Sequence, residues 1–391
     1  MSLSASQRAM LPFIALQGSI GTMIGFIGYF VMAAHDVHAM FGFTAAMLSS
    51  AMGATALAYV FGPRLRLSAA RVMRLAFLAP GLLLLLGDHS RWTLAMAYGS
   101  FLGLSWGARH WLEMSLLKDG ERDAYAARAG TATVLFSVGT TLTMTSLLAV
   151  FTERSDLVYQ VYGAICLLGG TLFGRGLPQA PLAPLQQPAT VLRQPQFIAC
   201  LPLFFLESGL FGISQALASA GASEALGSAS RFGWVATLAG LAGGIALYIT
   251  RRNRDVGNRA GWLGASCLVV GTAFLLLGAS VWIPALYIVY SVLKAVGSPF
   301  LLASEQVLNQ QTLDIEGALS DRIFARELVL WILRMTSLGM FWMLAETLAP
   351  RQVLIAGSMV LAVATGLEYL IGRARFAAAS ANPSPGAGQP A

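Results

Sequence analysis

Six polar or charged residues that could do chemistry lie inside long apolar runs of this chain: Gln17, Arg109, His110, Glu113, Glu207 and Lys294. An ionisable side chain within an apolar run is costly, so each one needs either a partner or a function. At 1.5 Å per residue from the expected ends of the runs, Glu207 lies about 16 Å from one edge, and Arg109 and Lys294 about 12–14 Å from it. At such depths two cations could attract a negatively charged group while a carboxyl takes up and releases a proton.

Each of these residues also has a simpler structural interpretation, and the sequence leaves both open. Arg109 and Glu113 are four residues apart and therefore face one another on one helical turn, as an internal ion pair would. Glu207 could pair with one cation and hold two helices together. His110 lies between two tryptophans, which is typical of hydrogen-bonded packing. No spacing of Cys, His and carboxylates suggests a metal site, so we expect neither a metal nor a cofactor.

A second set of charges lies where two of the apolar runs begin. Its members are Asp123 and Arg128 in one run, and Asp321, Arg326, Glu327 and Arg334 at the start of another. We interpret them as gating residues, whose salt bridges between helices form and break as a cavity opens. Static charges at helix ends explain them equally well.

These side chains must be positioned by membrane-spanning helices. About twelve apolar runs can be marked: 9–34, 42–61, 72–87, 92–117, 127–151, 156–174, 196–221, 230–250, 259–279, 281–303, 322–347 and 351–372. Each is long enough, or nearly so, to cross a hydrocarbon core of roughly 30 Å. The chain is only 11% charged, against roughly 25% for a soluble domain. The sequence therefore predicts an all-α membrane protein with twelve transmembrane helices.

The cations alternate between the two sides of this predicted bundle. One side carries 18 Lys and Arg residues and the other carries four, with Arg109, Lys294 and Arg334 inside runs. This is the positive-inside distribution, which places both termini in the cytoplasm. The net charge of +7 thus indicates contact with anionic lipids rather than nucleic acid. Only two of the 25 cations are Lys and Gly is abundant, which favours a GC-rich bacterium and its inner membrane.

The two halves of the chain share sequence patterns. A Leu-Pro-x-x-x-Leu-Gln/Glu pattern ends at Gln17 and again, 190 residues later, at Glu207. An Asp-x-x-x-Ala-Arg pattern begins at Asp123 and again, 198 residues later, at Asp321. The connections after the second and eighth runs are also alike, being short and rich in Arg. These matches indicate duplication of a six-span unit, which places a substrate path between the halves.

The domain boundaries follow from this repeat and from a proline-rich segment. We expect a six-helix half over 1–175, a cytoplasmic linker over 176–195, a second six-helix half over 196–375, and a disordered cytoplasmic tail over 376–391. The linker holds five prolines between 178 and 195, and such composition favours an extended connection.

Two pseudo-symmetric six-helix bundles, a long central linker and both ends inside resemble the major facilitator superfamily. The stretch from Gly62 to Arg71 keeps the Gly and the final Arg of that family's Gly-x-x-x-Asp-Arg-x-Gly-Arg-Arg signature but lacks its Asp. Gly130 and Gly139 are not followed by Pro, so the drug–proton antiporter branch is not supported. The resemblance implies that the first, fourth, seventh and tenth spans line a central cavity, and these spans hold all six candidate site residues.

We therefore expect a secondary transporter that carries a small polar solute, anionic or zwitterionic, by alternating access. Proton coupling through Glu207 is part of this expectation, and the partners are a small-molecule substrate, protons and membrane lipids. We expect a monomer. A lipid-handling or scaffold protein with the same fold and no soluble substrate remains the alternative. No nucleotide-binding P-loop is present, and no nucleophile–base constellation indicates an enzyme.

Overall fold

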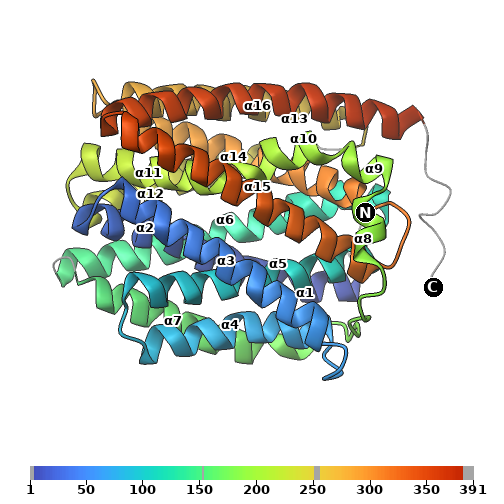
Figure 1. Cartoon of the computed structure of the whole chain (residues 1–391). Coiled ribbons are helices and arrows are strands. Elements are labelled where there is room, and N and C mark those ends of the chain that lie inside the picture. Colours follow the sequence, from blue (N-terminus) through green and yellow to red (C-terminus); the bar gives the residue numbers. More distant parts are fainter. Residues whose placement is uncertain (1–3, 152–153, 251–255, 382–391) are drawn as a thin grey trace.

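The computed structural model of the chain describes residues 4–151, 154–250 and 256–381, which form a bundle of long helices (Figure 1). The first half comprises α1 (Ala5–Gly21) followed by α2 (Met23–Ala34), α3 (Val37–Phe61), α4 (Ala69–Leu86), α5 (Arg91–Leu116), α6 (Asp119–Val150) and α7 (Ser155–Leu172). The second half begins with α9 (Pro195–Ile198), α10 (Leu201–Phe204), the π-helical turn η2 (Phe205–Gly209) and α11 (Phe211–Leu226). It continues with α12 (Ala229–Thr250), α13 (Arg259–Ala279), α14 (Leu286–Thr312), α15 (Leu319–Thr347) and α16 (Pro350–Ala381).

The predicted all-α membrane fold is confirmed. Ten helical segments of the described residues are long and apolar enough to cross a membrane. The remaining two long helices, α5 and α7, pack among them, α5 against α3 and α4, and α7 against α4. Together they make the twelve segments that the apolar runs predict.

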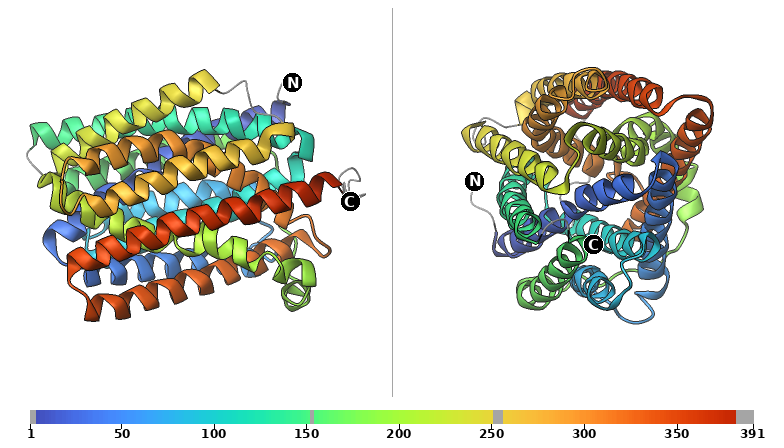
Figure 2. Two further views of the ribbon diagram at one scale, coloured as in Figure 1. Left: turned by 90° about the horizontal axis from the view of Figure 1, so that it is seen from above. Right: turned by 90° about the vertical axis from the view of Figure 1, so that its left-hand side faces the viewer.

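The helices gather in two groups around the centre of the molecule. Viewed end-on, α1 to α7 lie below and α11 to α16 above (Figure 2, right). The groups meet where α6 packs on α12, α3 on α15 and α2 on α11. The start of α1 and the end of α16 lie at the same end of the bundle (Figure 1). We call this the terminal end and the other the opposite end.

Close helix packing at equivalent places in the two groups depends on glycine. A Cβ atom on Gly103 of α5 would lie 2.0 Å from the carbonyl oxygen of Ala51 in α3, and one on Gly243 of α12 would lie 2.1 Å from that of Ala295 in α14. Glycine thus lets the second span approach the fourth, and the eighth approach the tenth, backbone to backbone. The shared geometry agrees with the duplication that the sequence indicates.

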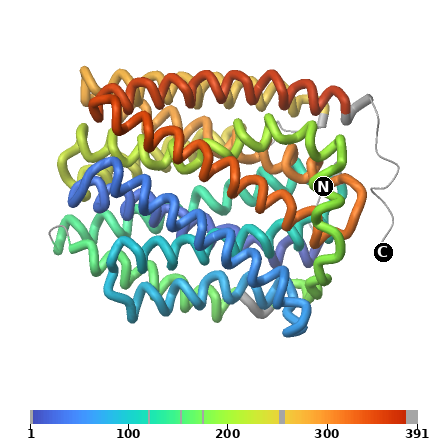
Figure 3. The backbone as a smooth tube through the Cα atoms, in the orientation of Figure 1, coloured from blue at the N-terminus to red at the C-terminus, as the bar shows by residue number. Residues whose placement is uncertain are grey.

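Residues 177–187 of the proposed linker are not helical and are docked onto the protein (Figure 3). The Ala69 N–H donates to the Ala180 carbonyl at 2.8 Å, and the Leu182 N–H donates to the Leu67 carbonyl at 3.2 Å. These bonds attach the first part of the linker to the loop between α3 and α4.

Asp321, one of the predicted gating residues, attaches the second part of the linker. Its two carboxylate oxygens accept the backbone N–H groups of Gln186 and Gln187, each at 2.9 Å. Val191, in the short helix α8 (Pro188–Leu192), is buried beside Phe197 of α9. The linker therefore contacts both halves at the terminal end.

Three helix ends differ from the ends of the apolar runs by eight or nine residues. The helix α14 continues to Thr312, nine residues beyond the expected end of its run, and α6 begins at Asp119 rather than at 127. In both cases polar side chains that lower the hydropathy are accommodated by partners inside the protein. The helix α16 continues to Ala381, beyond the end of its run at 372 and six residues into the tail predicted to be disordered from 376. Residues 382–391 of that tail lie outside the described residues.

Candidate functional site

A cavity of about 740 Å³ lies between the two groups of helices. Its lining includes one histidine and seven acidic or basic residues: His110, Arg109, Glu207, Lys294, Glu305, Arg326, Glu327 and Arg334. Gln17 also lines the cavity, so the wall includes every predicted binding residue except Glu113, which is buried behind it. Three predicted gating residues of α15 share this wall.

Arg109 and Glu113 form the internal ion pair that their spacing predicts. Arg109 Nε donates to Glu113 Oε1 at 2.6 Å. The guanidinium also donates from Nη1 to Gln17 Oε1 at 3.0 Å and lies over the Trp106 ring, 4.7 Å from its centroid. Gln17 donates in turn to Ser105 at 3.1 Å. The arginine thus joins the first span to the fourth.

Glu113 also connects the two halves. Its carboxylate accepts the side-chain amides of Gln306 at 3.0 Å and Gln310 at 3.1 Å, both on α14. With Arg109 it has three donors, and its side chain is only 1% exposed. A buried charge with this many hydrogen bonds is well compensated, so Glu113 acts first as a structural anchor between α5 and α14.

Glu207 lies in the π-helical turn η2, a distortion that is frequent at functional sites. The Asn309 side-chain amide donates to Glu207 Oε1. The other oxygen, Oε2, is buried and has no hydrogen-bond partner among the described residues. Gln17 of the first span contacts the fourth span, and its repeat counterpart Glu207 contacts the tenth, so the two positions have equivalent surroundings.

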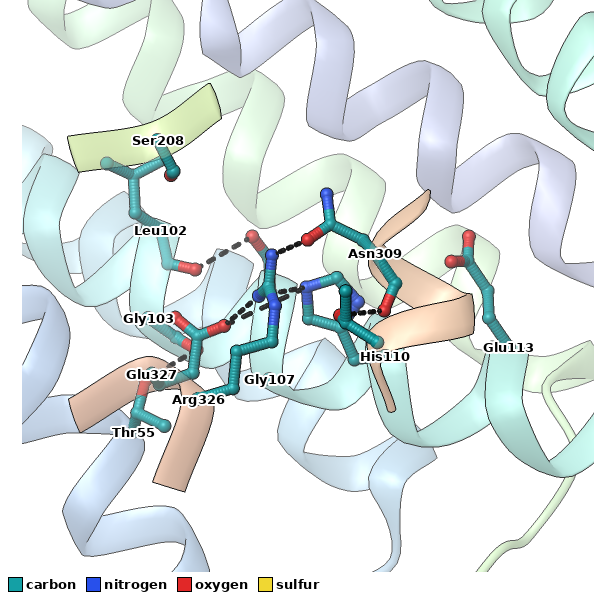
Figure 4. Close-up of polar contacts among 12 residues, drawn as sticks. Thr55, Leu102, Gly103, Gly107, His110, Glu113, Ser208, Asn309, Arg326 and Glu327 are labelled. Carbon is teal, nitrogen blue, oxygen red and sulfur yellow. Dashed lines mark hydrogen bonds and ion pairs between the residues drawn. The ribbon is translucent and has the colours of Figure 1, made fainter. Parts of the chain in front are cut away.

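Arg326 lies at the centre of a group of polar and charged side chains (Figure 4). Its guanidinium donates to Glu327 Oε1 at 2.7 Å, to the side-chain oxygen Oδ1 of Asn309 and to His110 Nε2 at 3.5 Å. Because arginine only donates, His110 accepts here through an unprotonated Nε2. The contact joins α5 to α15, and the Asn309 contact leads on to Glu207. We call Arg109, Glu113, Glu207, Asn309, Arg326 and Glu327 the charged cluster.

Arg334 stabilises the π-helical turn from the neighbouring helix. Its Nε donates to the Ser208 carbonyl at 3.1 Å, and its Nη2 contacts the Ser208 hydroxyl. The guanidinium lies over the Phe211 ring, 5.9 Å from the centroid. A helix distortion leaves backbone carbonyls without their regular partners, and Arg334 supplies one.

Lys294 lies apart from the charged cluster. Its Nζ donates to the Tyr290 hydroxyl at 3.0 Å and lies 5.4 Å from the centroids of the Phe274 and Tyr290 rings. Gln306, which binds Glu113, is twelve residues further along α14, or about 18 Å. The sequence predicted similar depths for Lys294 and Arg109 because it ended the tenth span at 303; the longer α14 places Lys294 much nearer the opposite end.

Sequence reasoning missed two carboxyls, Glu305 on α14 and Glu368 on α16. The two carboxyl groups are close enough to interact electrostatically. Glu305 lines the cavity, and Glu368 is 3% exposed. Glu305 falls just past the predicted end of its run, whereas Glu368 was visible as an acid inside an apolar run, the signal that marks a functional or paired group.

The remaining predicted gating residues lie at the terminal end. Asp123 pairs across the halves with Arg259 of α13 at 2.6 Å. Beside it, Arg122 forms a bidentate pair with Asp314 after α14, at 2.7 and 3.2 Å, which the sequence did not indicate. Arg128 is exposed. The structure therefore supplies the predicted type of contact between the halves, with partly different residues.

The chain matches no protein-family model and no curated protein. Its fold is similar to that of several solved transporters. The proton:xylose symporter XylE of the major facilitator superfamily is 14% identical, with a TM-score of 0.62 over 94% of this chain and 93% of that one. A POT family transporter bound to 5-aminolevulinic acid is 14% identical, with a TM-score of 0.62 over 95% and 97%.

The human organic anion transporter TETRAN is 15% identical, with a TM-score of 0.56 over 95% of this chain and 100% of that one. These likenesses cover nearly the whole chain. They show that the chain has the major facilitator fold, and at this identity they show the fold alone.

Proposed function

We propose that this protein is a secondary active transporter that carries a small polar solute through its central cavity by alternating access. The observation that supports this most directly is the cavity itself, because helices of both halves build its walls and charged groups of both halves face into it. A path between two repeated six-helix units suits rocking of one unit against the other.

Contacts between the halves lie on both sides of the cavity, as alternating access requires. At the terminal end they include the Arg122–Asp314 and Asp123–Arg259 pairs. Towards the opposite end, Phe232 of α12 packs against Phe26 and Tyr29 of α2, with ring centroids 5.4 and 5.5 Å apart. We propose that the first set opens while the second is closed, and the reverse. The cation bias supports a cytoplasmic position for the terminal end, and we propose a bacterial inner membrane as the location.

Glu207 is the proposed coupling residue. It lines the cavity, it occupies a distorted turn, and its Oε2 is buried without a partner among the residues described. Protonation would remove the cost of burying this charge. Asn309 contacts both Glu207 and Arg326, so a cation lies close to the carboxyl. The description of XylE as a proton symporter is consistent with this choice.

The experiment that tests this function is a comparison of accumulation and exchange in proteoliposomes. Labelled metabolites are first screened for uptake under an imposed proton gradient, and Glu207→Gln is then tested with the solute found. The variant should exchange solute at close to the wild-type rate but should not accumulate it. Glu224→Gln, a change at an exposed surface ion pair, is the matched control. Wild-type accumulation by Glu207→Gln would show that Glu207 is not the coupling site.

The lipid-handling or scaffold alternative predicts a different result. In that case no soluble solute would be carried by the wild type under any gradient. The charged walls of the cavity favour transport of a polar solute, since a path for lipid tails does not need three arginines from two halves.

A further inference from the structure

We infer that the cavity holds an anion-binding pocket at Lys294, separate from the charged cluster, that fits the anionic group of an amphipathic organic anion. We call this the Lys294 pocket, formed by Lys294, Tyr290 and the apolar walls beside them. The inference rests on the proposed function and names the class of solute that it would carry.

Lys294 differs from the cavity's arginines in its partners. Arg109 and Arg326 each pair with a carboxylate, at 2.6 and 2.7 Å, and Arg334 holds a backbone carbonyl. Among the described residues, the hydrogen bond from the Lys294 ammonium goes to a neutral tyrosine hydroxyl, and no carboxylate lies within 4.0 Å of it. Two of its three N–H donors are therefore available to a ligand.

The sequence around the pocket explains why no counter-charge is near. The helix segments 129–150, 229–250, 259–279 and 286–304, which form α6, α12, α13 and α14 at this level, contain no Asp or Glu. The first acid along α14 is Glu305, eleven residues or about 16 Å further on. The acidic lining residues Glu207, Glu305 and Glu327 all belong to the terminal-end side of the cavity.

An ammonium inside a membrane protein is costly without an anion, because burial removes its hydration and no opposite charge replaces that stabilisation. Aromatic rings compensate part of this cost, and Phe274 and Tyr290 both lie 5.4 Å from Nζ. They also fix the position of the side chain. A carboxylate or sulfonate of the solute would supply the missing charge and bond to the available donors.

The walls at this level suit an apolar body. Val134 and Val138 of α6 and Val235 and Ala239 of α12 line the cavity, as do Lys294 and Ala295 of α14. Phe232 and Ala236 continue the same lining. A solute with one anionic group and a compact apolar part would therefore place its charge at Lys294 and its body against α6 and α12.

Equilibrium binding to the purified full-length protein in detergent tests the pocket. The probes are 2-naphthalenesulfonate, a permanently charged anion, and 2-naphthalenesulfonamide, its neutral counterpart of similar shape, each titrated by calorimetry. We expect saturable binding of the sulfonate that is at least tenfold tighter than that of the sulfonamide. Lys294→Gln should weaken sulfonate binding at least tenfold and leave the sulfonamide unchanged, whereas Lys294→Arg should keep most of the affinity.

Arg231→Gln is the matched control, because it removes an exposed cation near the opposite end and should leave both affinities unchanged. The thermal unfolding midpoint of every variant shows that it is folded, and Lys294→Arg tests the charge if Lys294→Gln is unstable. Equal binding of the two probes to the wild type, no binding of the sulfonate, or equal sulfonate binding by wild type and Lys294→Gln would each overturn the inference.

Transport by the same variants separates this inference from the proposed function. Sulfonate binding that depends on Lys294, in a protein that carries no solute in proteoliposomes, would overturn the transport proposal and leave the anion pocket standing. Solute uptake that is unaffected by Lys294→Gln would overturn the anion pocket and leave the transport proposal standing.

Discussion

The two sides of the central cavity hold charge in opposite ways. In the charged cluster every arginine is compensated, and a chain of contacts runs from Gln17 through Arg109 and Glu113 to α14. In the Lys294 pocket one ammonium has a tyrosine hydroxyl and two aromatic rings. The difference teaches that buried charge serves two purposes here: paired charges fix the helices relative to one another, whereas the lone cation is left for a ligand.

The largest effect on stability should follow from replacing Arg326, the centre of the charged cluster. Arg326→Ala leaves Glu327 without its 2.7 Å partner in a mostly buried position. Breaking a buried ion pair in this way costs roughly 3–5 kcal/mol, so the free energy of unfolding should fall by that amount. Denaturant unfolding of the purified protein measures it.

The repeat provides the control for this variant. Arg128 occupies the matching position of the first half but is exposed, and an exposed charge contributes about 1 kcal/mol or less. Arg128→Ala should therefore have a small effect on the free energy of unfolding. If the two variants are destabilised equally, the charged cluster is not the anchor described above.

A smaller effect, on the attachment of the linker, is expected from a change at Asp321, near the start of α15. Asp321→Asn removes the charge that accepts two backbone N–H groups of the linker. Hydrogen bonds to charged groups contribute about 1.5–3 kcal/mol, so the linker should detach more often and residues 177–187 should be cleaved faster by added protease. Glu316→Gln, at an exposed acid nearby, should leave the rate unchanged, and faster cleavage in both variants would argue against the Asp321 anchor.

The smallest expected effect is an increase, rather than a decrease, in the free energy of unfolding. Lys294→Met replaces a lone buried ammonium by an apolar side chain of similar length, so it should raise the free energy of unfolding by about 1 kcal/mol, the lower end of the gain seen when buried charges are replaced by apolar groups. The unfolding measurement used for Arg326→Ala applies here too. A stability loss of about 2 kcal/mol or more, on the order of an ordinary core defect, would mean that Lys294 is a structural residue.

Much of the fold could be predicted because membrane solvation leaves few alternatives. Apolar runs of spanning length and an alternating cation bias specify the number and direction of the helices. The Arg109–Glu113 pair follows from helical periodicity alone. The repeated patterns correctly placed Gln17 and Glu207 in equivalent surroundings.

The contacts across the halves could not be predicted in the same way. Hydropathy ended the tenth span at 303, because Glu305, Gln306, Asn309 and Gln310 look like the start of a loop. Inside the protein these side chains bind partners on other helices, so the helix continues. The same error placed Lys294 too close to Arg109. Which acid meets which amide depends on tertiary packing, which has no local signature in the sequence.

The measurement that tests the central claim most directly is the distance between the halves at each end of the bundle. Spin labels at residues 65 and 374 report on the terminal end, and labels at 34 and 285 report on the opposite end; all four positions are exposed. Asp314→Asn weakens the Arg122 pair that joins the halves at the terminal end. Pulsed dipolar spectroscopy in nanodiscs should then show longer distances between 65 and 374 and shorter ones between 34 and 285. Distances that stay unchanged at both ends, or that lengthen together, would contradict alternating access through this cavity.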